Sequence, residues 1–90
     1  MNHELDDIAF DILNCIYFVE PFSKIIDEVN YPANIVADVL KSLIQKRLVS
    51  AMLWDENLQE YKRSFIYDSD NMNAYSYLAT KEGLLAHNSK

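Results

Sequence analysis

The chain has 90 residues, half of them hydrophobic and 24% charged, with 14 acidic and 8 basic side chains and a formal net charge of -6. This length and composition predict one soluble globular domain over residues 1–90, and no apolar run approaches the ~18 residues that a membrane span needs. The negative charge repels nucleic acid at long range, so binding to nucleic acid would require a local concentration of basic side chains.

Three helices are predicted in the first half of the chain. Apolar residues recur at three- and four-residue steps from Leu5 to Val19, and Glu20-Pro21 should end this helix because the residue before a proline avoids helical geometry. A short second helix is predicted from Phe22 to Val29, followed by a break at Asn30-Tyr31. The third helix is expected from Pro32 to Lys46, since proline is tolerated in the first helical turn.

The second half of the chain predicts strands. Apolar and other side chains alternate from Val49 to Trp54, which is the period of a strand. Aromatic and β-branched residues from Tyr61 to Tyr67 favour a further strand, and Asp68 to Asn73 has the composition of a turn. A last strand is expected from Ala74 to Ala79, and Thr80 suits the N-cap of a final short helix through Ala86.

Residues 23–43 resemble the bihelical unit of the winged helix-turn-helix family, and residues 77–83 resemble the end of that family's wing. The likeness extends over about Leu5 to Ala86. It implies an α+β fold in which a three-helix bundle is followed by a β-hairpin or three-stranded wing and a short C-terminal helix. It also implies the activity of bacterial and archaeal transcriptional regulators, which bind double-stranded DNA.

Departures from this family concern the end of the third helix and the length of the wing. Arg47 stands where the family often has a glycine in the left-handed conformation, so this helix end should differ or carry strain. The stretch from Val49 to Thr80 is longer than a minimal wing, which favours an enlarged hairpin or an extra strand.

The resemblance implies which side chains meet DNA, because the second helix of a helix-turn-helix unit enters the major groove. Candidates for base contacts are Asn34, Lys41 and Gln45, and candidates for phosphate contacts are Lys24, Lys46, Lys62 and Arg63. The competing interpretation is that the polar residues of the third helix form only the solvated face of an amphipathic helix.

A second candidate surface lies on the first predicted helix. At about 100° per residue, Phe10 and Phe18 flank Asn14 away from the main apolar stripe. Aromatic rings on a polar face suggest contact with a second copy in a homodimer, or with another protein. The alternative function is therefore a winged-helix protein interaction module without specific DNA binding. The rings would have no such role if the wing or the last helix covers them.

Other chemistry is not indicated. Cys15 has no basic neighbour and suits a buried, inert thiol; a lone cysteine and a start without signal-peptide features favour the cytoplasm. The single glycine, Gly83, excludes a Gly-rich phosphate loop. Residues 68–73 begin like a calcium loop, but Met72 stands where an oxygen ligand is needed. We therefore expect no enzymatic activity, metal, cofactor or small-molecule substrate.

Overall fold

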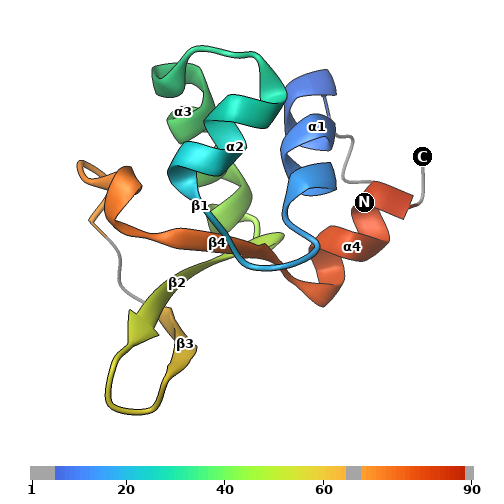
Figure 1. Ribbon diagram of the computed structural model, residues 1–90. Coiled ribbons are helices and arrows are strands. Elements are labelled where there is room, and N and C mark those ends of the chain that lie inside the picture. The colour runs from blue at the N-terminus through green and yellow to red at the C-terminus, as the bar shows by residue number, and fades with distance from the viewer. Residues whose placement is uncertain (1–5, 65–67, 89–90) are drawn as a thin grey trace.

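The computed structural model describes residues 6–64 and 68–88, which form a mixed α+β structure with a four-stranded antiparallel sheet. The helices lie above the sheet in Figure 1, except α4, which lies at its side. None of the helices in these residues is long and apolar enough to cross a membrane. In chain order the elements are α1 (Asp7–Cys15), β1 (Glu20–Pro21), α2 (Phe22–Val29), α3 (Ala33–Gln45), β2 (Val49–Asp55), β3 (Glu60–Ser64), the 3-10 helix η1 (Met72–Ala74), β4 (Ser76–Ala79) and α4 (Lys81–Asn88).

The sheet has the strand order β1-β4-β2-β3, so β2 lies between β4 and β3. Strands β2 and β3 form a hairpin with Asp55 opposite Glu60, and Gln59 in its turn has a φ of 54°. This hairpin projects away from the helices (Figure 1). It provides the extra strand expected from Tyr61 to Tyr67, although the last three of those residues lie outside the described part.

The end of the first helix differs from the prediction. α1 ends at Cys15 rather than Val19, and the backbone N–H of Ile16 bonds to the carbonyl of Leu13. The carbonyl of Ile16, whose side chain is fully buried, then accepts the backbone N–H of Ala79 at 2.9 Å. A hydrogen bond to a distant strand therefore replaces the next helical turn. The predicted start at Leu5 lies outside the described residues.

The pair of helices predicted as a bihelical unit is present. α2 spans the predicted residues, and α3 differs from its predicted span by one residue at each end. Asn30 turns the chain in the left-handed conformation, with a φ of 57°, and Pro32 is the N-cap of α3. Asparagine adopts this conformation more readily than most residues, which explains the short break.

The core lies between the helices and the upper part of the sheet. Its fully buried large side chains are Ile12, Leu13, Ile16, Ile25, Val36, Leu40, Leu48 and Tyr77. The Tyr77 hydroxyl donates a buried hydrogen bond of 2.7 Å to the carbonyl of Met72, and the side chain of Met72 is itself buried. The segment predicted only as a turn is therefore anchored to the core. The last strand begins at Ser76, two residues later than predicted, because η1 occupies residues 72–74.

The end of α3 is tied to the start of α4. Arg47 has a φ of 62°, so it adopts the left-handed conformation for which the family often uses glycine. Thr80 caps α4 as predicted: its Oγ1 accepts the backbone N–H of Gly83 at 3.0 Å. Gly83 packs so closely on Leu48 that a Cβ at this position would collide with the Leu48 carbonyl oxygen.

Candidate interaction surfaces

The outer face of α3 borders a groove and is not covered by the rest of the described chain. Asn34 is exposed, and the side chain of Lys41 is 33% exposed. The groove has a volume of about 400 Å³ and separates α3 from residues 69–73. Asn34 and Lys41 therefore reach solvent. The major groove of DNA or a protein partner can approach this face of α3.

The charge of this groove does not favour phosphate. Lys41 Nζ lies 3.9 Å from Asp38 Oδ1, one turn earlier on α3. Asp70 lines the opposite side of the groove. An exposed ion pair stabilises a protein by only about 0–1 kcal/mol, so a phosphate can compete for the lysine. However, the neighbouring carboxylates weaken the local positive potential that DNA binding needs.

Two lysines of the predicted phosphate-binding set, like Lys41 of the base-contact set, lie beside carboxylates. Lys24 Nζ is 3.8 Å from Glu20 Oε1, and Lys62 Nζ is 3.4 Å from Asp55 Oδ2. The backbone N–H groups of Leu58 and Asn57, together with Lys62, hold the pKa of Asp55 below its ordinary value. Asp55 therefore stays ionised to a lower pH than an ordinary aspartate, and its charge is paired with that of Lys62.

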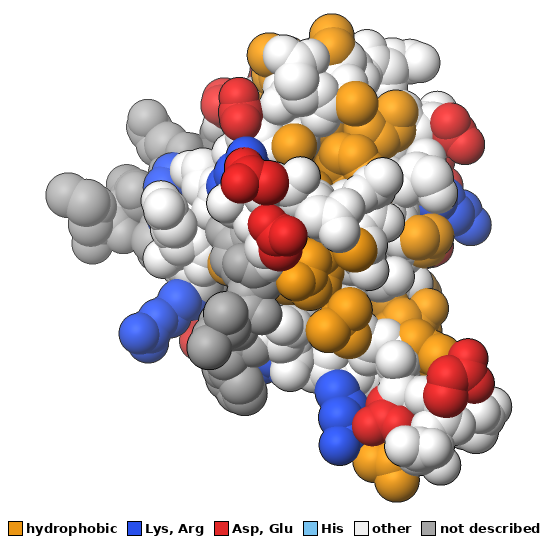
Figure 2. Space-filling view, turned by 90° about the vertical axis from the view of Figure 1, so that its left-hand side faces the viewer, with side chains coloured by type: hydrophobic (Ala, Val, Ile, Leu, Met, Phe, Trp, Pro, Cys, Tyr) orange, Lys and Arg blue, Asp and Glu red, His pale blue; other side chains and the backbone are white. Residues whose placement is uncertain are grey.

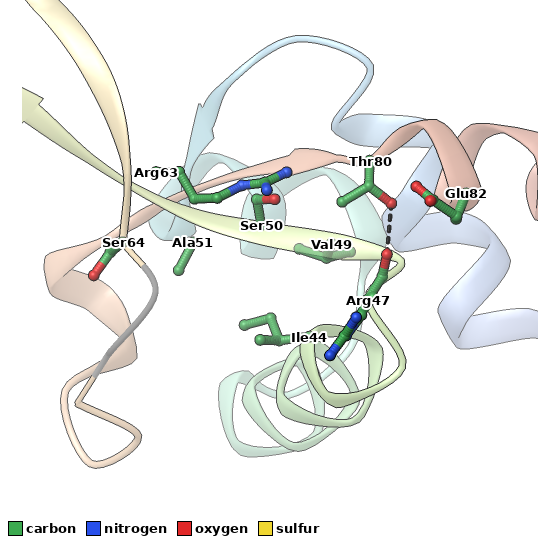
Figure 3. Close-up of a pocket in the computed structure, with 9 residues that line it drawn as sticks. All are labelled: Ile44, Arg47, Val49, Ser50, Ala51, Arg63, Ser64, Thr80 and Glu82. Atoms are coloured by element: carbon green, nitrogen blue, oxygen red, sulfur yellow. Dashed lines mark hydrogen bonds between the residues drawn. The ribbon is translucent and has the colours of Figure 1, made fainter.

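Arg63 and Lys62 lie on opposite faces of the hairpin, because neighbouring residues in a strand alternate. Arg63 lines a hollow of about 580 Å³ between the end of α3, the strands and the start of α4. Figure 3 shows its side chain lying across β2 beside Ser50, whereas Arg47 lies on the α3 side. Glu82 lines the same hollow and adds an opposing charge. Arg63 and Arg47 thus line one hollow from opposite sides of β2, and Arg63 lies on the other hairpin face from Lys62.

The remaining predicted DNA contacts lie at the C-terminal end of α3. Gln45 is its last residue and Lys46 its C-cap, and both are exposed. They are separated along α3 from Asn34, which lies in its first turn. The structure therefore brings Asn34 and Lys41 to one groove and leaves Gln45 and Lys46 at the other end of the helix.

The proposed aromatic surface on α1 is not a continuous helical face. Phe10 stacks on His87 of α4, with ring centroids 4.2 Å apart and planes inclined by 22°. Phe18 is 81% exposed, but it follows the end of α1 and so does not continue the face that carries Phe10 and the exposed Asn14. The last helix thus covers part of Phe10, as the competing interpretation expected.

A second group of exposed large apolar side chains, apart from Phe18, lies on the β2–β3 hairpin. Leu53, Trp54, Leu58 and Tyr61 are 43%, 45%, 54% and 40% exposed. Trp54 and Tyr61 pack edge to face, with centroids 5.0 Å apart. Figure 2 shows apolar side chains continuing from the main body onto a projecting lobe that also carries acidic and basic groups. The alternation of side chains along the strand did not indicate that Leu53 is exposed. An apolar residue within the polar turn, Leu58, was the one sequence signal of an exposed apolar surface on this hairpin.

The described residues contain no group of three or more His, Cys, Asp or Glu side chains arranged to hold a metal ion. Burial, and then the carboxylate of Glu28, raise the pKa of the Cys15 thiol to about 12, which makes it a poor nucleophile.

No protein family, curated protein or solved structure matches this chain at a significant level. The proposals below therefore depend on the arrangement of its own residues.

Proposed function

We propose that the chain is a winged-helix domain that binds proteins through its β2–β3 hairpin. The winged-helix assignment is supported by the order of elements, in which α1, α2 and α3 precede the main strands and a projecting hairpin. The short break between α2 and α3 and the Thr80 cap of α4 agree with the family resemblance.

The observation that carries the proposal is the mixed apolar and acidic surface of the hairpin. Four large apolar side chains are exposed there, and the tip, residues 55–60, contains three carboxylates, of which Asp55 is paired with Lys62 of β3. Apolar and aromatic side chains are the usual anchors of protein interfaces, whereas carboxylates repel the phosphates of DNA. A wing of this composition suits a protein partner better than a nucleic-acid backbone.

Photo-crosslinking tests this function. A photoreactive amino acid replaces the exposed Leu58 in the chain expressed in its source cells, and the same amino acid replaces the exposed Asp27 of α2 as a control. We expect adducts with protein to form several-fold more at position 58 than at position 27. Equal yields at the two positions, or adducts with nucleic acid at position 58, would contradict the proposal.

DNA binding through α3 is the second candidate function. It is favoured by the exposure of Asn34 and Gln45 and by the two arginines, Arg47 and Arg63, that line the hollow at the end of α3. If this function holds, affinity for random duplex DNA should fall steeply between about 50 mM and about 200 mM salt. It should also fall in Arg47→Ala/Arg63→Ala, while Lys24→Ala, whose ammonium lies beside Glu20, should change it little. No binding at low salt would eliminate this candidate.

A further inference from the structure

Strand β3 ends the row of described strands, with β2 as its neighbour. A strand at the end of a sheet presents backbone N–H and C=O groups that a further strand can pair with. The hairpin extends away from the helices, so a second strand can approach it from the side (Figure 1). This placement makes residues 60–62 of β3 a template for pairing with another chain.

The side chains of β3 distinguish between the ways in which two copies could pair. When two identical strands pair antiparallel, the two-fold axis perpendicular to the sheet passes midway between the two copies of one residue, which face each other. A residue that precedes this central residue then faces the residue of the other copy that follows it by the same number of positions. Centring on Lys62 places the two lysines opposite each other, which is destabilising. Centring on Tyr61 places the Glu60 of each copy opposite the Lys62 of the other, so two such contacts form.

We propose that a second copy of this chain adds its β3 to this edge, antiparallel and centred on Tyr61. The inference rests on the proposed function, for which it names the partner. The pairing joins the two four-stranded sheets and forms two Glu60–Lys62 contacts on one face. On the other face the two tyrosines meet, each already packed against Trp54 at 5.0 Å, so that four aromatic rings lie in a row.

A lysine on an outer strand ordinarily discourages such pairing. Here Lys62 already lies 3.4 Å from Asp55 within the hairpin, and the Tyr61 register adds the Glu60 of the other copy, so the lysine is not buried without a counter-charge. The shared strand is short, and an interface of this kind lies at the small end of the range for protein complexes. The dimer is therefore transient, and its detection needs a concentration series that extends to about 1 mM.

Disulfide trapping tests the register. Directly opposite residues in an antiparallel pair have Cβ atoms about 4.5–5.5 Å apart and diagonal ones about 7–8 Å apart, whereas a disulfide needs about 3.5–4.5 Å. In a Cys15→Ala background, mild oxidation of Tyr61→Cys should yield several-fold more covalent dimer than oxidation of Lys62→Cys. Equal trapping of both, or more at position 62, would overturn the proposed centre.

Charge substitution tests the contacts across the axis. Glu60→Lys replaces both attractive pairs by repulsive ones and should raise the dimer dissociation constant by about tenfold. It also removes the like-charge pair formed with Asp55, which lies directly opposite within the hairpin, so it should not lower the stability of the monomer. Glu60→Lys/Lys62→Glu restores the complementary pairs and should restore association, and Asp27→Lys, far from the hairpin, should not change it.

Two outcomes separate this inference from the proposed function. If the chain stays monomeric at about 1 mM while position 58 still crosslinks to other proteins, the self-association is wrong and the proposed function stands. If position 58 captures no protein and the chain stays monomeric, both proposals are wrong.

Discussion

The Thr80 hydroxyl donates a 2.7 Å hydrogen bond to the carbonyl of Arg47, and its oxygen also accepts the backbone N–H of Gly83. One side chain thus satisfies a carbonyl just after α3 and an N–H in the first turn of α4. Because helix ends leave such backbone groups without helical partners, Thr80 links the two helices through groups that would otherwise need water.

Thr80→Ala should lower the free energy of unfolding by about 2 kcal/mol, because it removes a helix cap and a hydrogen bond to the Arg47 carbonyl. Thr80→Ser keeps the hydroxyl and should lie within about 0.5 kcal/mol of the natural chain. Urea unfolding of the three chains measures the difference. A serine variant as unstable as the alanine variant would show that the methyl group, and not the hydroxyl, matters.

Arg47→Gly should stabilise the fold by about 0.5–1 kcal/mol. Arg47 has a φ of 62°, a conformation that glycine adopts without the steric cost of a Cβ. The neighbouring Lys46 has a φ of -83°, so Lys46→Gly should instead destabilise by a similar amount. Thermal unfolding of both variants tests the contrast, which is refuted if the two glycines shift the midpoint in the same direction.

Gly83→Ala should destabilise the fold by about 3 kcal/mol or more, although alanine is the better helix former by about 1 kcal/mol. The added Cβ would collide with the carbonyl oxygen of Leu48, and backbone atoms cannot move aside as a flexible side chain can. Leu85→Ala on the same helix is the control, because that side chain is 61% exposed and its loss should cost little. A stable alanine variant at position 83 would mean that α4 packs less closely than described.

Cys15 should make stability fall in alkaline solution. Burial, followed by interaction with Glu28, raises the pKa of its thiol from 9.0 to about 12 in the folded chain. The folded chain therefore keeps the proton that the unfolded chain loses, so this contribution is complete below pH 9 and is lost as the pH rises toward 12. The difference in unfolding free energy between the natural chain and Cys15→Ala should decrease over this interval. A difference independent of pH would contradict the raised pKa.

The helices at residues 22–29 and 33–45 agree with the sequence because their signals are local. An apolar stripe, a break at Asn30 and a proline at the start of α3 act within a few residues of one another. The end of α1 was predicted wrongly because Val19 continues the apolar spacing, while the hydrogen bond that ends the helix comes from Ala79. Periodicity contains no information about a partner that lies 63 positions away, as Ala79 does from Ile16.

The candidate surfaces were less predictable than the fold. Alternation placed Leu53 on the same side as Val49 and Ala51, and this is the side on which both of those residues are buried. Leu53 is nevertheless exposed, because the hairpin extends beyond the helices, and alternation gives the face of a residue but not how far the covering layer reaches. The number of basic residues in the sequence likewise does not show which of them are paired. Lys24 and Lys62 lie beside Glu20 and Asp55, and these ion pairs depend on where the side chains lie in the fold.

The pairing of β1 with β4 also bears on how the chain is made. Glu20 and Pro21 find their partners in Tyr77 and Ser76, so a nascent chain has both helices of the α2–α3 pair well before the strand that completes its sheet. Contacts of such long sequence separation form late and slowly compared with local helical ones. On the ribosome, the first helix should therefore acquire its fixed end only after Ala79, whose backbone N–H bonds to the carbonyl of Ile16, has emerged.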